Sequence, residues 1–240
     1  MTYWKDDMYQ KAASMLKDSA GHPLVKLMKK GQLHFLLWKL EEARDAYIKP
    51  VELAPDNALA ATSLTGRNPK LGDGPNAKRY LEKALELDPT YGGAWNNLAA
   101  FHRNTGNLEE AERCYLKAIE SKGTRIHSYI YLGITQKELG KLEAAEETLR
   151  RCIEKKSRNV HCFRELGDVL GNLHKWKEAE QAFQRLTEIT PKDDLAWYNL
   201  GYAPYHLEKW DAAQTSFERA IELEPSLSER LTGIGFELRE

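Results

Sequence analysis

Histidine and cysteine are the side chains in this sequence that could bind a metal ion. His127 and His161 stand 34 residues apart, and Cys162 directly follows the second of them. Zinc ligands usually occur in short motifs such as C-x2-C or H-x3-H, because two ligands on one turn or helix face reach the same ion. The sequence contains neither motif. We therefore expect no metal site, and we interpret these histidines as part of a solvated polar surface.

A glycine-containing segment, residues 133–142, has only a faint likeness to a phosphate-binding loop. Six residues separate Gly133 from Gly140, and no serine or threonine follows Lys141. The phosphate-binding motif G-x-x-x-x-G-K-[ST] needs its shorter loop and its hydroxyl to hold phosphate and Mg²⁺. No G-x-S-x-G, H-E-x-x-H or glycine-rich dinucleotide turn occurs either. The sequence therefore predicts a protein that is not an enzyme, with no catalytic residues and no cofactor.

The three cysteines, Cys114, Cys152 and Cys162, cannot form a closed set of disulfides, which is typical of a reducing compartment. Cys152 falls in a packing position and is interpreted as a small buried apolar residue. A regulatory disulfide with Cys162 is the alternative.

The charges are nearly balanced, with 35 lysines and arginines against 36 acidic residues, and 42% of the residues are hydrophobic. This composition excludes a wholly disordered chain. Nucleic acids and anionic membranes attract a basic excess, so we expect neither as a partner. No apolar run reaches the roughly 18 residues of a membrane-spanning helix, and the N-terminus lacks a signal-peptide layout. We expect a cytoplasmic protein without membrane insertion.

The elements that would position any site follow a 34-residue repeat. Alanine returns at this spacing as Ala43, Ala77, Ala111, Ala145, Ala179 and Ala213. Four residues after each stands a bulky residue: Tyr47, Leu81, Tyr115, Leu149, Phe183 and Phe217. Side chains four apart share one helix face, and prolines that follow in four copies end the helix. Those prolines are Pro55, Pro89, Pro191 and Pro225.

A second helical pattern precedes each of the last four alanines. It consists of an aromatic residue, a leucine and a small residue: Trp95-Leu98-Ala99, Tyr129-Leu132-Gly133, Phe163-Leu166-Gly167 and Trp197-Leu200-Gly201. Turns between the two helices are predicted at Gly106-Asn107, Gly140-Lys141, His174-Lys175 and Glu208-Lys209. Each copy is therefore predicted to be a helix-turn-helix pair.

These columns resemble the tetratricopeptide repeat, whose pattern is W-x2-L-G…A-x3-F-x2-A…P. The resemblance implies an all-α fold, a right-handed α-solenoid superhelix of helix-turn-helix repeats. Six copies cover residues 24–57, 58–91, 92–125, 126–159, 160–193 and 194–227. Helical spacing predicts an N-terminal helix or half repeat at 1–23 and a C-terminal capping helix at 228–240.

Prolines and glycines predict two irregularities in this arrangement. The copy at 58–91 is degenerate, because Gly66 and Pro69 interrupt its first helix, and we expect residues 65–76 to be an open loop. Pro204 should remove one backbone hydrogen bond and kink the first helix of its copy.

The resemblance also implies that the first helices line a concave groove that binds a peptide or protein segment. We expect the groove to be lined by Asn96, Asn97, Arg103, Tyr131, Arg164, Tyr198, Asn199, Tyr202 and Tyr205. An asparagine amide can pair with the backbone of an extended ligand, and tyrosine offers rigid aromatic area with a polar group.

The sequence thus predicts a non-catalytic scaffold that binds a peptide or helix of a partner protein. The alternative is a self-assembling module, a homo-oligomer that docks or polymerises within a larger complex. A piece of a larger enzyme is a further alternative.

Overall fold

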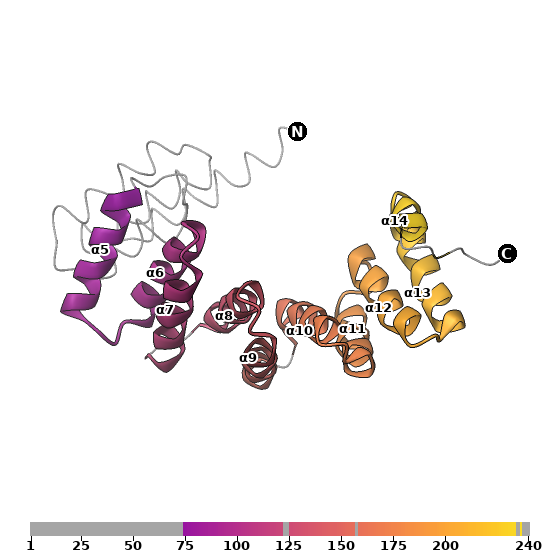
Figure 1. Ribbon diagram of the computed structural model, residues 1–240, viewed down its shortest axis with the longest axis horizontal. Coiled ribbons are helices and arrows are strands. Elements are labelled where there is room, and N and C mark those ends of the chain that lie inside the picture. The colour runs from indigo at the N-terminus through magenta and orange to yellow at the C-terminus, as the bar shows by residue number, and fades with distance from the viewer. Residues whose placement is uncertain (1–73, 122–124, 157, 234–235, 237–240) are drawn as a thin grey trace, which may run out of the picture. The chain divides into compact units, whose positions relative to one another are not determined.

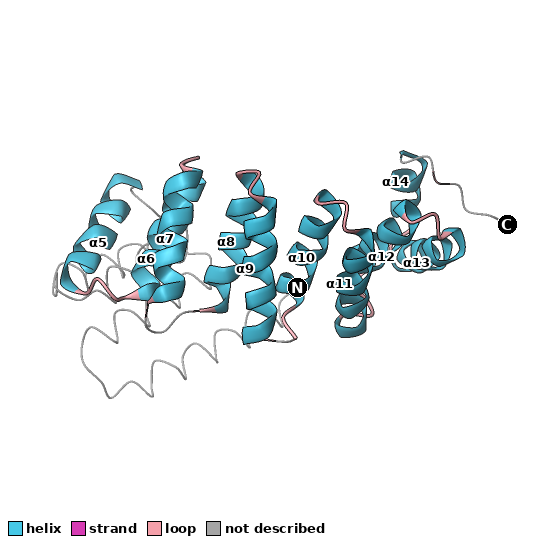
Figure 2. Ribbon diagram, turned by 60° about the horizontal axis from the view of Figure 1, so that its bottom comes forward, coloured by secondary structure: helices cyan, strands magenta, loops and turns pink. Residues whose placement is uncertain are grey.

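The computed structural model describes residues 74–121, 125–156, 158–233 and 236. Within these ranges the chain forms helices joined by short turns, with no β-strand (Figures 1 and 2). The helices are α5 (Gly74–Leu87), α6 (Gly92–Asn104), α7 (Leu108–Glu120), α8 (Ile126–Glu138), α9 (Leu142–Lys155), α10 (Val160–Asn172), α11 (Trp176–Ile189), α12 (Asp194–His206), α13 (Trp210–Leu223) and α14 (Leu227–Gly233). The predictions for residues 1–73, including the N-terminal helix and the first copy, lie outside the described residues.

The chain divides into two compact units, residues 1–125 and 126–240. The described part of the first unit contains α5, α6 and α7, and that of the second contains α8 to α14. Helices pack in the predicted pairs: α6 on α7, α8 on α9, α10 on α11 and α12 on α13. In the second unit α9 also packs on α10, and α11 on α12. The described helices therefore form the helix pairs of an all-α solenoid, and within the second unit each copy stacks on the next.

The alanine column forms the centre of each helix pair. Ala111, Ala145, Ala179 and Ala213 are each 0% exposed. The bulky residues four positions later, from Leu81 to Phe217, are buried as well. The bulky residue on the second helix of a copy meets the small residue of the first helix, as at Gly133, Gly167 and Gly201. A Cβ added at Gly167 would lie 2.4 Å from a ring carbon of Phe183, so this close approach requires glycine.

The turns lie where the sequence predicts them. Gly106 and Gly140 adopt φ values of 81° and 73°, and His174 and Glu208 adopt φ of 57° at the same place in their copies. This left-handed conformation ends a helix with little cost for glycine and at a modest cost for other residues. Asn159 and Asp193 then begin α10 and α12, because each side chain accepts a hydrogen bond from the backbone N–H three residues on.

One of the two predicted irregularities differs from the structure, and the kink expected at Pro204 stays a prediction. Helix α5 begins at Gly74, so the expected open loop at 65–76 ends earlier than predicted, and residues 65–73 lie outside the described part. Proline is favourable in the first turn of a helix, where its missing N–H has no partner to lose, and Pro75 occupies that place. Pro204 lies in the last turn of α12, which continues to His206.

The cysteine interpretation is wrong in one respect. Cys152, near the end of α9, and Cys162, near the start of α10, form a disulfide with Cα atoms 6.0 Å apart. Both side chains are buried, and Cys114 is the free cysteine of the described residues. The short connection between the helices brings the two cysteines together, a proximity that an odd cysteine count does not reveal.

Candidate functional site

The predicted groove residues fall in both units. Asn96, Asn97 and Arg103 lie half-buried on α6 of the first unit, and Asn96 Nδ2 donates to Asn97 Oδ1 at 3.5 Å. The other six lie on the first helices of the second unit: Tyr131 on α8, Arg164 on α10, and Tyr198, Asn199, Tyr202 and Tyr205 on α12. Tyr131 is 38% exposed, and Asn199 and Tyr202 are half-buried.

Tyr198 does not lie on an open surface, so the prediction that it faces a groove is wrong. Its side chain is 8% exposed and belongs to a cluster with Phe217, Leu227, Leu231 and Phe236. The ring lies 5.6 Å from that of Phe217, and the Arg230 guanidinium sits 4.8 Å from its centroid. Burial raises the pKa of Tyr198. Leu227, Leu231 and Phe236 cover this end of α12 and α13, and Tyr198 packs against them.

Lys137 on α8 and Arg164 on α10 each form an ion pair with an acidic residue on, or directly before, the next first helix in the stack. Arg164 on α10 binds the Asp193 carboxylate at 2.5 Å, and Lys137 on α8 binds Glu165 on α10 at 2.8 Å. The Lys137 ammonium also lies 3.7 Å from Asp168, whose pKa is raised by burial against the opposing effect of Lys137. Arg164 therefore helps to join α10 to the start of α12, and these side chains present little net charge.

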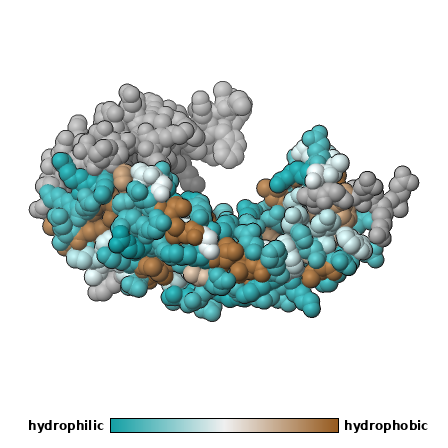
Figure 3. All heavy atoms as spheres, in the orientation of Figure 1, coloured by the Kyte–Doolittle hydropathy of each residue, from teal (hydrophilic) through white to brown (hydrophobic). Residues whose placement is uncertain are grey.

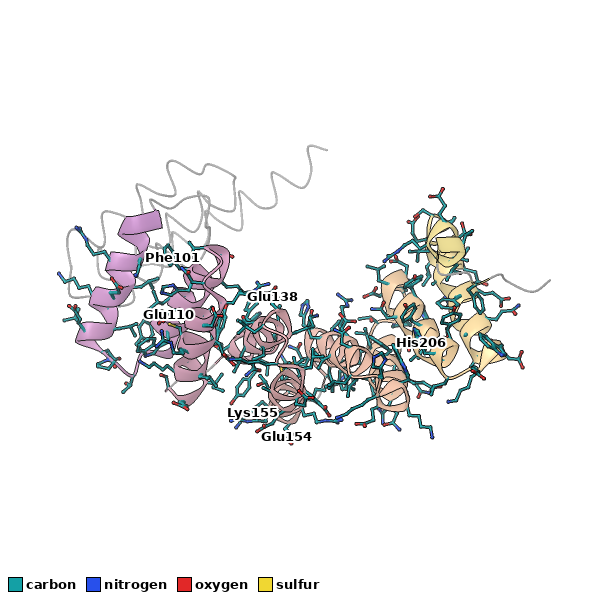
Figure 4. The ribbon with its side chains drawn as sticks, viewed as in Figure 1. Phe101, Glu110, Glu138, Glu154, Lys155 and His206 are labelled. Atoms are coloured by element: carbon teal, nitrogen blue, oxygen red, sulfur yellow. A yellow bond between two sulfur atoms is a disulfide. The ribbon has the colours of Figure 1, made fainter. Side chains whose placement is uncertain are left out.

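An aromatic surface lies around the C-terminal end of α12; we define it as Trp176, Tyr202, Tyr205, His206 and Trp210. Trp176 and His206 stack with ring centroids 4.0 Å apart, and Tyr202 lies 4.7 Å from His206. Tyr205 contacts Trp210 at 5.8 Å, and Trp210 is 42% exposed. Figure 4 labels the exposed His206 on this helix.

The aromatic surface is uncharged near neutral pH. Burial and the neighbouring His174 lower the pKa of His206 from its usual value of 6.5. A neutral imidazole stacked on an indole offers flat apolar area with hydrogen-bonding edges, which is the composition of many protein-interaction hot spots.

Sequence reasoning predicted Tyr202 and Tyr205 but missed Trp176 and Trp210 as members of this surface. Both tryptophans directly follow an inter-helix turn, at positions where earlier copies carry Leu108 and Leu142. The replacement of leucine by tryptophan at these positions could have indicated an aromatic surface. On the face shown in Figure 3, hydrophobic residues of the described part form small patches between hydrophilic ones.

Tetratricopeptide repeat patterns match residues 70–91, 90–158 and 164–228. The chain belongs to the tetratricopeptide repeat family. A search of curated protein sequences returns no match.

Solved structures similar to this tetratricopeptide repeat chain share its fold at low identity. YrrB, described as a TPR protein with an unusual peptide-binding site, is 22% identical over 80% of this chain and 100% of its own, with a TM-score of 0.68. PilF of Pseudomonas aeruginosa is 20% identical over 84% of this chain and 92% of its own, with a TM-score of 0.68. MamA is 23% identical over 67% of this chain and 94% of its own, with a TM-score of 0.61.

No helix of the described residues combines the length and the apolar character needed to cross a membrane.

Proposed function

We propose that this chain is a non-catalytic scaffold that binds an extended peptide segment of a partner protein in the second unit. The segment would lie along the first helix α12 and contact the aromatic surface. The observation that carries the proposal is the set of contacting rings from Trp176 to Trp210. The half-buried Asn199 lies three residues before Tyr202 on α12, a spacing that puts both on one helix face. The peptide-binding site named for YrrB supports this proposal by likeness of fold.

The chemistry of this surface defines the ligand that it suits. Asn199 can donate to and accept from a ligand backbone, while Tyr202 and Trp176 offer faces for apolar or proline side chains. Because Arg164 pairs with Asp193, and Lys137 pairs with Glu165 and Asp168, a strongly charged peptide gains little there. The preferred ligand is therefore a weakly charged segment with aromatic, aliphatic or proline residues.

Selection of peptides from a random displayed library on the full chain tests this proposal. Dissociation constants of the selected peptides are then measured by fluorescence anisotropy for the native chain and for variants. We expect Asn199→Ala and Tyr202→Ala to weaken binding about five- to a hundred-fold, because each should remove roughly 1–3 kcal/mol of binding free energy. Glu147→Ala, an exposed change on the second helix α9, should leave binding unchanged.

Tyr198 makes a poor probe of binding, because its burial means that Tyr198→Ala would also disturb packing. If selected peptides bind equally well to Asn199→Ala and Tyr202→Ala, the groove proposal is wrong. Self-assembly then becomes the better proposal, and a sedimentation series over increasing protein concentration measures it directly.

A further inference from the structure

Three potential metal ligands meet inside the first unit. His102 lies on α6, and Glu110 and Cys114 lie one helical turn apart on α7 (Figure 4 labels Glu110). A ring nitrogen of His102, a carboxylate oxygen of Glu110 and the sulfur of Cys114 all lie within 4.8 Å of one another. Imidazole, carboxylate and thiolate are the donor types that zinc takes in proteins.

One ring nitrogen of the buried His102 lacks a hydrogen-bond partner among the described residues. Its side chain is 8% exposed, and its Nδ1 is buried without a hydrogen-bond partner in the described part of the chain. A buried polar atom left unpaired costs about 1–3 kcal/mol, so its persistence calls for an explanation. Burial also lowers the pKa of His102, which keeps the ring neutral and a nitrogen lone pair available.

Among the described copies, histidine and cysteine occur at these positions only in the copy at 92–125. The positions of His102, Glu110 and Cys114 carry Gln136, Ala144 and Thr148 in the next copy. There the Thr148 hydroxyl donates to Gln136 Oε1 at 2.8 Å, so the repeat geometry brings these positions into contact. The following copies carry Leu170, Glu178 and Ala182, and then Pro204, Ala212 and Ser216. Helix packing in these copies therefore does not require histidine or cysteine there.

We propose that His102, Glu110 and Cys114 bind a zinc ion in the first unit. The three side chains occupy three positions of a tetrahedral site, and water from the adjoining pocket fills the fourth. That pocket lies between α5, α6 and α7 and includes Glu82, Trp95 and Asn107 in its lining. The ion would join α6 to α7 and so stabilise the copy that follows the degenerate one.

Binding requires that the Cys114 thiol lose its proton to solvent. Burial and the nearby Glu110 raise the pKa of this thiol to about 11. The positive charge of the zinc ion would lower the pKa of the Cys114 thiol again, since a thiol that coordinates a metal ion is deprotonated outright. Glu110 forms an ion pair with Arg113 and accepts a hydrogen bond from Cys114 Sγ at 3.8 Å. When zinc binds, it would replace the hydrogen bond between the thiol and the carboxylate. The Glu110 carboxylate would then bind both zinc and Arg113. Affinity should consequently fall as pH is lowered.

Titration of the metal-free full chain with Co²⁺, a spectroscopic substitute for Zn²⁺, tests the site. We expect one equivalent to produce a thiolate-to-cobalt absorption band, and Zn²⁺ to displace it. Cys114→Ala should abolish the band. His102→Leu and Glu110→Ala should lower cobalt affinity at least about tenfold, since changes even outside a coordination shell often cost that much.

The other copies supply variants that suit the fold, because Leu170, Ala144 and Ala182 already occupy these positions. Circular dichroism of each variant checks folding, and if Cys114→Ala is unfolded the other two variants carry the test. The double variant Cys152→Ala/Cys162→Ala must keep the band. A native chain without the band, a band that survives in Cys114→Ala, or a band lost with the cysteine pair would each overturn the proposal.

Discussion

At the scale of single residues, the alanine column determines how closely the two helices of a copy approach. Each described member is fully buried, and Ala145 lies in one cluster with Leu149, Phe163 and Leu166. No space remains for a larger side chain, because buried cores are packed as densely as organic crystals. The sequence repeats alanine here for its small size.

We predict that Ala145→Leu lowers the free energy of unfolding by about 1–3 kcal/mol, the usual cost of overpacking a filled core. Ala212→Leu is the matched control, because Ala212 is exposed on α13 and surface changes usually stay within about 0.5 kcal/mol. Urea denaturation followed by circular dichroism measures both. Equal midpoints for the two variants would contradict the repeat alignment.

A second residue-level prediction concerns acid stability. Glu146 is 12% exposed and binds Lys175 at 2.7 Å and Arg150 at 2.8 Å. Burial acts to raise its pKa, but the hydrogen bonds from Lys175 and Arg150 outweigh burial and hold the pKa below its usual 4.5. A lowered folded-state pKa adds stability that is present above the unfolded-state pKa and is lost as pH falls through the folded-state value.

Stability should therefore fall more between neutral pH and about pH 3 in the native chain than in Glu146→Gln, which has no carboxylate to protonate. Urea denaturation at both pH values provides the comparison. Glu147→Gln, a change at the exposed neighbour, should retain the native pH dependence. An identical acid response in Glu146→Gln and the native chain would show that this ion pair contributes nothing.

At the scale of elements, the disulfide joins the second helix of one copy to the first helix of the next. Cys152 and Cys162 are separated by 10 residues, so the bond closes a short loop between α9 and α10. A crosslink of this kind stabilises mainly by restricting the unfolded chain. It therefore stabilises the folded junction between these two copies relative to the unfolded chain, without adding a packing contact.

We predict that Cys152→Ala/Cys162→Ala lowers the free energy of unfolding by about 2–4 kcal/mol relative to the oxidised chain. The native chain in reductant should approach the stability of the double variant. Alkylation of the denatured, unreduced chain should label Cys114 alone, as measured by mass spectrometry. Labelling of all three cysteines would contradict the pairing.

At the scale of the whole molecule, the copies of the second unit interact with their neighbours in sequence. Equivalent ion pairs reinforce this: Lys175 binds Glu146, and Lys209 binds Glu180, both at 2.7 Å across successive copies. In such a solenoid, stability is approximately a sum of copy and nearest-neighbour contributions. The destabilising effect of a local defect should then decrease with distance along the stack.

We predict that Phe217→Ala, which removes a fully buried ring at a cost of about 3–5 kcal/mol, has a graded effect on hydrogen exchange. Exchange should accelerate most in α12 to α14, less in α10 and α11, and least in α8 and α9. Mass spectrometry of peptide fragments measures this gradient. Uniform acceleration across the second unit would instead indicate a single cooperative block.

The sequence alone determined the helix pairs, their turns and the buried columns of this tetratricopeptide repeat chain. Gly167 and Gly140 were predictable because each depends on residues of its own copy, and a 34-residue period repeats those residues. Helical spacing and backbone preference are local properties.

Only the tertiary structure decided which side chains of different helices meet. The sequence predicted that Tyr198 and Arg164 are available to a ligand. In the structure Leu227, Leu231 and Phe236 bury Tyr198, and Asp193 pairs with Arg164. The contact between Trp176 and His206, the Cys152–Cys162 bond and the cluster at His102 likewise join side chains from different helices. These contacts depend on the stacking angle and rotamers of packed helices, which the spacing of residues along one helix does not specify.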